Sequence, residues 1–384
     1  MKDVSSGKPL RILEVIPALN SGGAERFVVD LCNQMARDEC EVTLLTMKNF
    51  SLRNFGFYKD DIASGVKVVN LGLGKFAPTT FYWLYRAIRQ QKCDVVHFHL
   101  TAIYFGVLAV LFDRKKKYIV TSHNQAESER TNERFRYWVK KLCLKMRLLR
   151  QVAISDQNAQ SVRTVFGMPP VRLIYNGREM VSASDKFNEV KREVSRCKQD
   201  DDTKVFTVIA RCNPQKNIPR LIRCFNRLID DGENVALLVI GNGYAAPEMQ
   251  SVISQAKGGI HFLGQRHNVA DYLLCSDFFT LSSDYEGMPI TLIEAFACGC
   301  IPVGTPVSGF NDVVTDGANG FIAKDFSDEA YTEALKRALA HGNSISKDSL
   351  RWTYAQNFSM ETCAHKYEML FREMVESSYN CKHI

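Results

Sequence analysis

The fold is constrained most strongly by an alternation of short apolar runs with helical patterns, which occurs in both halves of the chain. The first half contains the β-type runs LRILEVIPA, CEVTLLTM, DVVHFHL and YIVTSHN, with helical stretches around residues 80–91, 101–112 and 130–149. A polar segment, SASDKFNEVKREVSRCKQDDDTK, breaks the pattern, which restarts with KVFTVIAR, VALLVIGNG, DFFTLSS and IPVGT. Alternation of this kind predicts parallel strands joined by helices that cover both faces of a sheet.

We therefore expect an α/β chain with two doubly wound, Rossmann-like domains, residues 1–178 and 179–357, and a long helix within residues 358–384. The length of 384 residues agrees with two domains. Open parallel sheets bind ligands at the carboxyl ends of their strands. We accordingly expect an interdomain cleft, faced by the polar motifs that follow the predicted strands.

The composition is that of a soluble globular chain, with 46% hydrophobic and 24% charged residues. The apolar window TAIYFGVLAVLF is too short to span a bilayer, and the N-terminus lacks the apolar stretch of a signal peptide. The 12 cysteines contain no C-x-x-C pair. We expect buried, reduced thiols and a cytoplasmic protein.

The net charge of +7 is unevenly distributed. Residues 1–178 carry 28 Lys and Arg against 15 Asp and Glu, whereas residues 179–384 carry 21 against 27. This asymmetry predicts that the first half meets an anionic partner or surface. We do not expect nucleic acid, because no recognition motif is present and few aromatic residues interleave with the basic ones.

A basic amphipathic helix is predicted over Arg134–Arg150, a segment with seven basic residues and no acidic one. Its apolar stripe consists of Phe135, Trp138, Val139, Leu142, Met146 and Leu149. Arg134, Lys141 and Lys145 flank one side of this stripe, and Arg136, Lys140 and Arg147 flank the other. This layout is typical of helices in a lipid interface. We expect peripheral contact with an anionic membrane at the inner face of the cell. The alternative is a surface helix whose stripe faces the core, and a second apolar set (Tyr137, Leu144, Leu148) fits either arrangement.

Two glutamates, Glu286 and Glu294, lie in the apolar segment EGMPITLIEAFACG. Glu286 is expected in a loop after a strand, and Glu294 about one turn into the following helix. A carboxylate accepts two hydroxyl donors at once, as a sugar diol requires. Backbone amides of Gly287, Met288 and Ile290 at the helix start suit phosphate or sugar oxygens, and Pro289 suits a first helical turn. The alternative is that both acids only complement the helix dipole.

Two further motifs follow strands in the second half. Arg211 and Lys216 lie five residues apart in IARCNPQKN, where their charges can converge on one diphosphate. A solvated loop is the alternative. Gly241 and Gly243 in VIGNGY permit close approach of a ligand such as a nucleobase, although a tight turn explains them equally well.

The first half contributes glycines and histidines. Gly22 and Gly23 precede a helix, so free amides are expected there. The motif is not G-x-G-x-x-G, which argues against a dinucleotide cofactor. His97 and His99 share one face of a strand, and His123 ends the next strand. A histidine in the cleft can hydrogen-bond a sugar or act as a base. His123 is the preferred candidate, with His97 and His99 left open.

The segments SGGAE, VIARCNPQKNIPRLI, VIGNG and SSDYEGMPITLIEAFACGCIPVGTPVSG resemble the family-four, group 1 glycosyltransferases, which have the GT-B fold. The resemblance covers most of the chain and is densest from about residue 204 to 323. There are two departures. TSHN stands where an acidic residue often follows the histidine, and Ser308 replaces one of two adjacent glycines.

The resemblance implies a retaining, metal-independent transfer of a hexose-type sugar from a nucleotide-sugar donor such as a UDP-sugar. Glu294 would bind the ribose, Glu286 the donor sugar, and Arg211 and Lys216 the diphosphate. The backbone from Gly287 to Ile290 would contact sugar and phosphate, and the C-terminal helix would return to the first domain. Gly22, Gly23 and His123 would line the cleft, and no bound cofactor or metal is expected.

Charge and resemblance together suggest a lipid-linked glycan acceptor and a role in cell-surface polysaccharide, capsule or lipopolysaccharide synthesis. A nucleotide-sugar 2-epimerase and a non-catalytic nucleotide-sugar-binding component of a polysaccharide complex are the alternatives. An assay for sugar release without acceptor separates the epimerase from the transferase.

Overall fold

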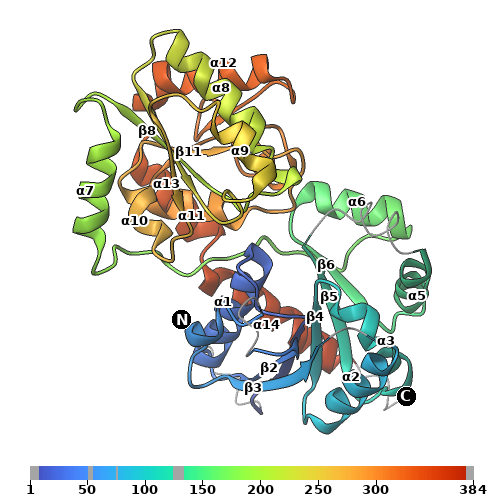
Figure 1. The fold of residues 1–384 in the computed structure, drawn as a ribbon. Coiled ribbons are helices and arrows are strands. Elements are labelled where there is room, and N and C mark those ends of the chain that lie inside the picture. Colours follow the sequence, from blue (N-terminus) through green and yellow to red (C-terminus); the bar gives the residue numbers. More distant parts are fainter. Residues whose placement is uncertain (1–7, 51–54, 75–76, 124–133, 378–384) are drawn as a thin grey trace. The chain divides into compact units, whose positions relative to one another are not determined.

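The structure, a computed structural model, describes residues 8–50, 55–74, 77–123 and 134–377. The chain divides into two compact units, Met1–Glu179 with Met360–Ile384, and Met180–Ser359. We describe each unit by itself (Figure 1).

The first unit contains a seven-stranded parallel sheet in the order β3-β2-β1-β4-β5-β6-β7. Its strands are β1 (Arg11–Ile16), β2 (Glu41–Lys48), β3 (Lys67–Leu73), β4 (Val95–His99), β5 (Lys117–Ser122), β6 (Arg150–Ala153) and β7 (Arg172–Leu173). Its helices are α1 (Gly23–Arg37), α2 (Thr79–Gln90), α3 (Ala102–Phe112), α5 (Arg134–Lys145), α6 (Asp156–Phe166) and α14 (Met360–Glu376). A short 3₁₀ turn, η1, covers Lys59–Asp61.

Helices cover both faces of this sheet (Figure 1). The chain moves in opposite directions from β1 to β2 and from β4 to β5, so right-handed crossovers place α1 and α3 on opposite faces. Alternation along β4 directs Val96 and Phe98 into the apolar core beneath α2, α3 and α5. His97 and His99 point to the other face, where α14 packs.

The second unit contains a six-stranded parallel sheet in the order β10-β9-β8-β11-β12-β13. Its strands are β8 (Lys204–Ile209), β9 (Val235–Ile240), β10 (Ile260–Gly264), β11 (Phe278–Leu281), β12 (Ile301–Gly304) and β13 (Phe321–Ile322). Its helices are α7 (Phe187–Cys197), α8 (Ile218–Asp230), α9 (Pro247–Ile253), α10 (Val269–Leu274), α11 (Ile290–Cys298), α12 (Asp328–His341) and α13 (Lys347–Asn357). The 3₁₀ turns are η2 (Pro214–Lys216), η3 (Ser308–Phe310) and η4 (Gly342–Ser344).

These two sheets confirm the predicted α/β fold with two doubly wound, Rossmann-like domains. The helix expected over 130–149 is observed over Arg134–Lys145, because Arg147 has a φ of +55° and the chain turns there into β6. Within the described ranges, no helix combines the length and the apolarity that crossing a membrane requires.

Candidate functional site

The strand order of the second unit reverses between β8 and β11. The chain continues from β8 to β9 and β10 on one side, and from β11 to β12 and β13 on the other. In open α/β sheets, ligands bind at the carboxyl ends of the two strands that flank such a reversal. Arg211 and Lys216 follow β8, and Glu286 follows β11. The fold therefore brings these three predicted residues to one edge of one sheet.

Glu286 is held by three neighbours. The Lys216 Nζ atom lies 2.5 Å from Oε1, and Ser283 Oγ donates to the same oxygen at 2.7 Å. Gln215 Nε2 donates to Oε2 at 3.2 Å. The side chains of Glu286 and Lys216 are 8% and 18% exposed. Since an ammonium group has three donors, Lys216 can keep this contact and still offer N–H groups to a ligand.

Arg211 differs from Lys216 in its surroundings. It is exposed, and within the described residues it forms no ion pair. A guanidinium group that is always charged and is not neutralised by the protein is suited to bind an anionic group. Among the described residues, the two cations at this edge thus divide into one that is paired with an acid and one that is not.

Gly241 and Gly243 pack against the loop that carries Arg211. Gly241 has a φ of +150°, and a Cβ atom on it would lie 1.8 Å from the Ala210 carbonyl oxygen. Cys212 donates its amide to the Asn242 carbonyl at 2.8 Å. The need for glycine at 241 is therefore explained by contact between two loops of the protein. The contact with a nucleobase stays a prediction.

The N-terminus of α11 lies after the Glu286 loop. Pro289 is the N-cap residue, and the helix begins at Ile290. Glu294 is 5% exposed and lies four residues after Ile290, so it shares that face of the first turn. Gly287 and Met288 are packed against η3, since a Cβ on Gly309 would lie 2.2 Å from the Gly287 carbonyl oxygen.

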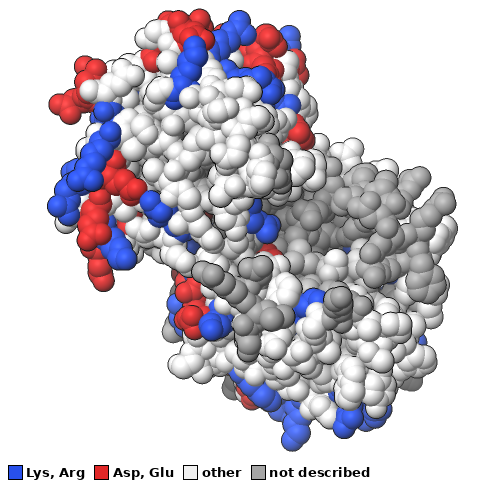
Figure 2. Space-filling model, in the orientation of Figure 1, with Lys and Arg blue, Asp and Glu red and all other residues white. Residues whose placement is uncertain are grey.

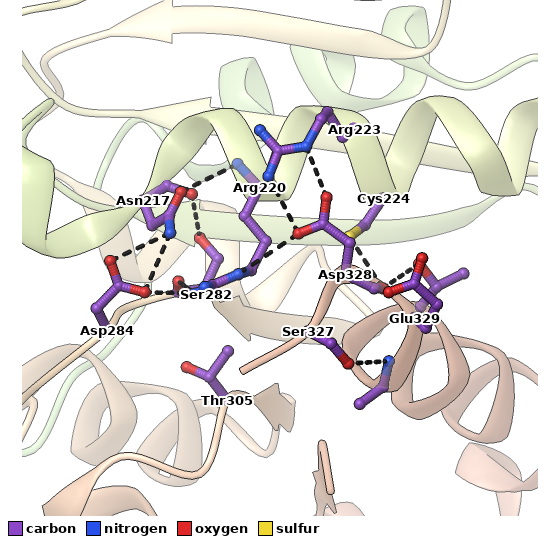
Figure 3. Close-up of polar contacts among 12 residues, drawn as sticks. Asn217, Arg220, Arg223, Cys224, Ser282, Asp284, Thr305, Ser327, Asp328 and Glu329 are labelled. Carbon is purple, nitrogen blue, oxygen red and sulfur yellow. Dashed lines mark hydrogen bonds and ion pairs between the residues drawn. The ribbon is translucent and has the colours of Figure 1, made fainter. Parts of the chain in front are cut away.

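A polar network braces the loops after β8 and β11 (Figure 3). Asn217 caps α8 and donates to both carboxylate oxygens of Asp284 at 3.0 and 3.1 Å. Arg220 Nη1 donates to Asp284 at 2.7 Å and to the Ser282 carbonyl at 3.0 Å. The Ser282 hydroxyl in turn donates to the Lys216 carbonyl at 2.9 Å. These contacts fix the backbone that presents Lys216 to Glu286.

The same network extends from α8 to the start of α12. Arg223 Nε donates to Asp328 at 2.6 Å, and the Arg220 Nε atom lies 3.7 Å from the same carboxylate. Ser327 caps α12 by accepting from the Ala330 amide at 3.1 Å (Figure 3). The bracing network is thus anchored to two helices as well as to the two loops.

In the first unit, Gly22 and Gly23 lie at the start of α1, with Gly22 as the N-cap residue. A Cβ atom on Gly22 would lie 2.3 Å from Oε2 of Glu25. The Glu25 carboxylate therefore lies beside Gly22, and the Gly22 amide, which was expected to be free, donates to the Asn20 carbonyl at 2.8 Å. Gly23 remains exposed.

The three histidines belong to one hydrogen-bonded chain in the first unit. Glu14 Oε2 on β1 lies 2.9 Å from His97 Nδ1 and 2.6 Å from His99 Nε2. His99 Nδ1 lies 3.0 Å from His123 Nε2. His97 and His99 are fully buried, whereas His123 is partly exposed. His97 and His99 are thus satisfied core residues, and His123 is the histidine that a ligand can reach.

Burial and neighbouring charges determine the pKa values of Glu14 and the histidines in this hydrogen-bonded chain. Burial alone would raise the pKa of Glu14, but the charge and hydrogen bonds of His97 and His99 outweigh it and lower the pKa to about 2. Burial lowers the pKa of His99 to about 4, against the opposing effect of Glu14. Burial also lowers the pKa of His123 well below its usual value. Glu14 is accordingly ionised at neutral pH, and His99 and His123 are neutral.

A metal ion is the other ligand that such a group suggests, because Glu14, His97 and His99 bring ligand atoms within 4.8 Å of one another. The facing atoms already satisfy each other by hydrogen bonds of ordinary length, from His97 Nδ1 and from His99 Nε2 to Glu14. We therefore interpret the group as a hydrogen-bonded network.

Helix α5 only partly follows the predicted arrangement. Trp138, Leu142 and Met146 of the expected stripe are 63%, 53% and 50% exposed. Leu149 is buried, against expectation, because it belongs to the turn that leads into β6. Lys140 is buried as well, with Nζ 4.8 Å from the centre of the Phe166 ring.

The rest of the helix completes this picture. Tyr137 and Leu144 of the second apolar set face the core. The side chains of Arg134, Phe135 and Arg136, and Asn124 of the TSHN motif, lie outside the described residues.

The neighbouring helices add to this surface of the first unit. Tyr82 and Trp83 on α2 and Phe112 on α3 are also exposed, and α3 contacts both α2 and α5. Figure 2 shows mainly Lys and Arg along the edge of the first unit that carries α2 and α3, whereas both signs of charge alternate over α7 of the second unit.

Sequence reasoning missed two groups of residues. Glu14 lies in the apolar run LRILEVIPA, and the cost of burying a carboxylate without partners was a signal in the sequence that could have identified it. The second group is the bracing set Asn217, Arg220 and Asp284. Its polar residues are ordinary loop and helix-cap residues in sequence, and only the fold shows that they meet.

Comparison with known proteins identifies similar sequences for both halves. The family model described as Glycosyl transferases group 1 matches residues 190–355, and the one described as Glycosyltransferase Family 4 matches residues 21–180. The chain is 22% identical to UDP-Gal:alpha-D-GlcNAc-diphosphoundecaprenol alpha-1,3-galactosyltransferase of Escherichia coli, over 98% of this chain and 99% of that protein.

Other similarities cover different shares of the chain. Identity to N-acetyl-alpha-D-glucosaminyl L-malate synthase of Bacillus anthracis is 25%, over 50% of this chain and only 52% of the synthase. The crystal structure of HepE from Anabaena in complex with UDP and glucose matches with a TM-score of 0.79 at 15% identity. That match covers 95% of this chain and 100% of HepE, and it shows a common fold.

Proposed function

The chain belongs to the group 1 glycosyltransferases of the family-four type and has the GT-B fold, and from this premise we propose that it transfers a hexose-type sugar from a UDP-sugar to a lipid-linked glycan. The crystal structure of HepE with UDP and glucose supports the choice of donor. The name of the Escherichia coli relative, a galactosyltransferase acting on a diphosphoundecaprenol-linked sugar, supports the choice of acceptor. The product would be a precursor of a cell-surface polysaccharide, such as capsule or lipopolysaccharide.

The observation that carries the proposal is the arrangement of charge at the reversal point of the second sheet. A paired Lys216–Glu286 and an exposed Arg211 lie on adjacent strand ends. A departing nucleoside diphosphate accumulates negative charge on its β-phosphate, and fixed cations there stabilise the transition state. Arg211 supplies a planar fork for the phosphate oxygens, and Lys216 supplies a point charge held in place by Glu286.

The remaining residues of the second unit have complementary roles in the proposal. Glu286 accepts hydrogen bonds from hydroxyl groups of the donor sugar, and Glu294 accepts them from the ribose diol. Amides at the start of α11, around Gly287 and Ile290, bind sugar and phosphate oxygens. Gly241 and Gly243 form the loop beside Arg211 at which the uracil base lies.

The chemistry follows from these positions. Two cations and a helix N-terminus supply the charge stabilisation that a divalent ion would otherwise provide, so we propose that transfer needs no metal. No enzyme nucleophile is assigned. We propose retention of the anomeric configuration through departure and attack on the same face of the sugar. His123 of the first unit contacts a substrate hydroxyl.

Binding measurements on the full chain test the role of Arg211. Calorimetric titration with UDP should show binding, and Arg211→Ala should weaken it about 10- to 100-fold, because a charge-assisted hydrogen bond contributes ~1.5–3 kcal/mol. The same substitution should weaken the binding of UMP much less, because UMP lacks the β-phosphate. Arg227→Ala is the matched control, since Arg227 is an exposed arginine on α8. Equal loss for UDP and UMP would contradict the assignment to the diphosphate.

Turnover measurements test the reaction itself. A panel of UDP-sugars with a polyprenyl-diphosphate-linked sugar should give a glycosylated lipid whose new linkage keeps the donor's anomeric configuration. Activity should persist in EDTA. Release of free sugar without acceptor would instead favour an epimerase, and loss of activity in EDTA would contradict metal independence.

For the first unit, we propose peripheral binding to an anionic membrane at the inner face of the cell. The exposed apolar residues Trp138 and Leu142 on α5, and Met146 just after it, would enter the lipid interface, with nearby basic residues at the headgroups. Lys140 has no part in this contact because it is buried under the helix.

A further inference from the structure

Six polar side chains of the first unit form one continuous hydrogen-bonded chain, which the proposed reaction does not use apart from its end. The chain runs through Tyr367, Thr121, His97, Glu14, His99 and His123. It joins α14, β5, β4 and β1. Because Glu14, His97 and His99 have no solvent exposure, their hydrogen bonds must be made to other members of this hydrogen-bonded chain rather than to water.

The position of each hydrogen atom follows from Glu14, because its ionised carboxylate carries no proton to donate. Glu14 is ionised and can only accept, so His99 must donate its Nε2–H across the 2.6 Å contact. A neutral imidazole has one donor and one acceptor, which leaves His99 Nδ1 as an acceptor. Across the 3.0 Å contact, His123 must then donate its Nε2–H to His99.

The other half of the chain runs towards the same carboxylate. His97 Nδ1 donates to Glu14 at 2.9 Å, so in a neutral ring Nε2 accepts from the Thr121 hydroxyl at 2.7 Å. Thr121 Oγ1 then accepts from the Tyr367 hydroxyl at 2.9 Å. A second proton on His97 would change only this half, because the His99 half depends on Glu14 alone.

We infer that Glu14, acting through His99, fixes His123 as the Nε2–H tautomer and makes its Nδ1 atom a hydrogen-bond acceptor. The opposite tautomer would turn His99 Nε2 into a lone pair facing a carboxylate oxygen at 2.6 Å. The His123 ring is also held edge-on against Phe27, with centroids 5.6 Å apart. Within the described residues, Nδ1 of His123 has no hydrogen-bond partner.

The functional consequence rests on the proposed function. An unprotonated His123 Nδ1 accepts a hydrogen bond from a sugar hydroxyl and cannot donate one to a ring oxygen or a phosphate. Glu14 and His99 are therefore positioning residues that select for a substrate hydroxyl at this place. A substrate whose corresponding hydroxyl is replaced by hydrogen would leave Nδ1 unpaired, and its kcat/KM should fall about 3- to 10-fold, the value of one ordinary hydrogen bond.

Nitrogen-15 NMR of the full chain with labelled histidine tests the tautomer directly, without any need for activity. The His123 signals are assigned by their loss in His123→Gln. At neutral pH we expect a protonated Nε2 and an unprotonated Nδ1. His99→Phe, which removes the acceptor, should give a mixture of both tautomers. Thr121→Val is the matched control, since it breaks only the His97 half and should leave the His123 signals unchanged.

Three results would overturn the inference. One is a wild-type His123 with its proton on Nδ1 or on both nitrogens. Another is a His123 signal that does not change in a folded His99→Phe. The third is a stoichiometric metal ion in the purified protein, because Glu14 and the histidines would then be its ligands. If His99→Phe does not fold, the wild-type spectrum and Thr121→Val decide. Failure of sugar transfer would leave the NMR result standing, so the two proposals fail separately.

Discussion

The Lys216–Glu286 pair provides the sharpest test of the site in the second unit. Replacing Lys216 by Met keeps much of the side-chain stem but removes the cation. Exposed ion pairs contribute ~0.2–1 kcal/mol, and breaking a fully buried pair costs ~3–5 kcal/mol. With 18% and 8% of their side chains exposed, this pair lies between these limits. Ser283 and Gln215 still bond the carboxylate in the variant, so we expect a loss of ~1.5–3 kcal/mol.

A double-mutant cycle isolates the interaction from the other effects of each substitution. Lys216→Met, Glu286→Gln and the double variant are unfolded in urea, and hydrogen exchange of peptides from β8 and β11 reports the free energy of the second unit separately. A loss of ~2 kcal/mol corresponds to a melting shift of ~4–8 °C for a unit of this size. We expect a coupling energy of ~1–2 kcal/mol.

The matched control is the pair Arg227–Glu329, whose charged atoms are 3.7 Å apart with side chains 56% and 75% exposed. Its coupling should be below ~0.5 kcal/mol. If the Lys216–Glu286 coupling is no larger than that of the control, the two residues are not held together in solution. The view of a preorganised cation at this strand end would then be refuted.

Three other predictions concern a glycine in a tight loop contact, the dependence of stability on pH, and binding to membranes. Gly241→Ala should destabilise the second unit by at least ~2 kcal/mol in urea unfolding, because its Cβ would meet a carbonyl oxygen at 1.8 Å, whereas Gly258→Ala, with nothing within 4 Å, should be neutral. Glu14 and His99 have folded pKa values of about 2 and about 4, both below their unfolded values, so the unfolded state binds more protons. Hydrogen exchange should therefore show the first unit losing stability as the pH falls below ~6.5, and constant stability down to pH 4 would contradict this. Trp138→Asp should weaken sedimentation with anionic liposomes, and unchanged binding would exclude α5 as the contact.

The sequence predicts the architecture well because both sheets leave a strong pattern. Apolar runs such as VALLVIGNG lie between helical segments at regular intervals, and buried parallel strands require that pattern. The position of the candidate residues follows from the same logic, since Arg211, Lys216 and Glu286 each lie in the segment that links a strand to the next helix. What the pattern cannot give is which loops are neighbours, because that depends on strand order.

The errors have specific physical causes. Lys140 was expected among the membrane-facing basic residues, but its ammonium lies over the Phe166 ring, a contact that helical periodicity does not reveal. Gly22 was expected to offer a free amide, but that amide donates to the Asn20 carbonyl, and Glu25 in the first turn of α1 lies beside the glycine. In both cases, a neighbour on the same helix or across the core determines the environment of the side chain.

Each sheet has polar groups at its own reversal of strand order. In the second unit, Lys216 and Glu286 neutralise each other there, and Arg220 and Asp284 beneath them hold the loops. In the first unit, Glu14 and the buried histidines stand at the β1 and β4 strands that flank the reversal. These charges are satisfied before any ligand arrives, so binding need not reorganise them, and it is low reorganisation that makes fixed charges effective in catalysis. Within the described residues, the Arg211 guanidinium and His123 Nδ1 are left without a protein partner, so these groups can contact a ligand without first giving up a protein contact.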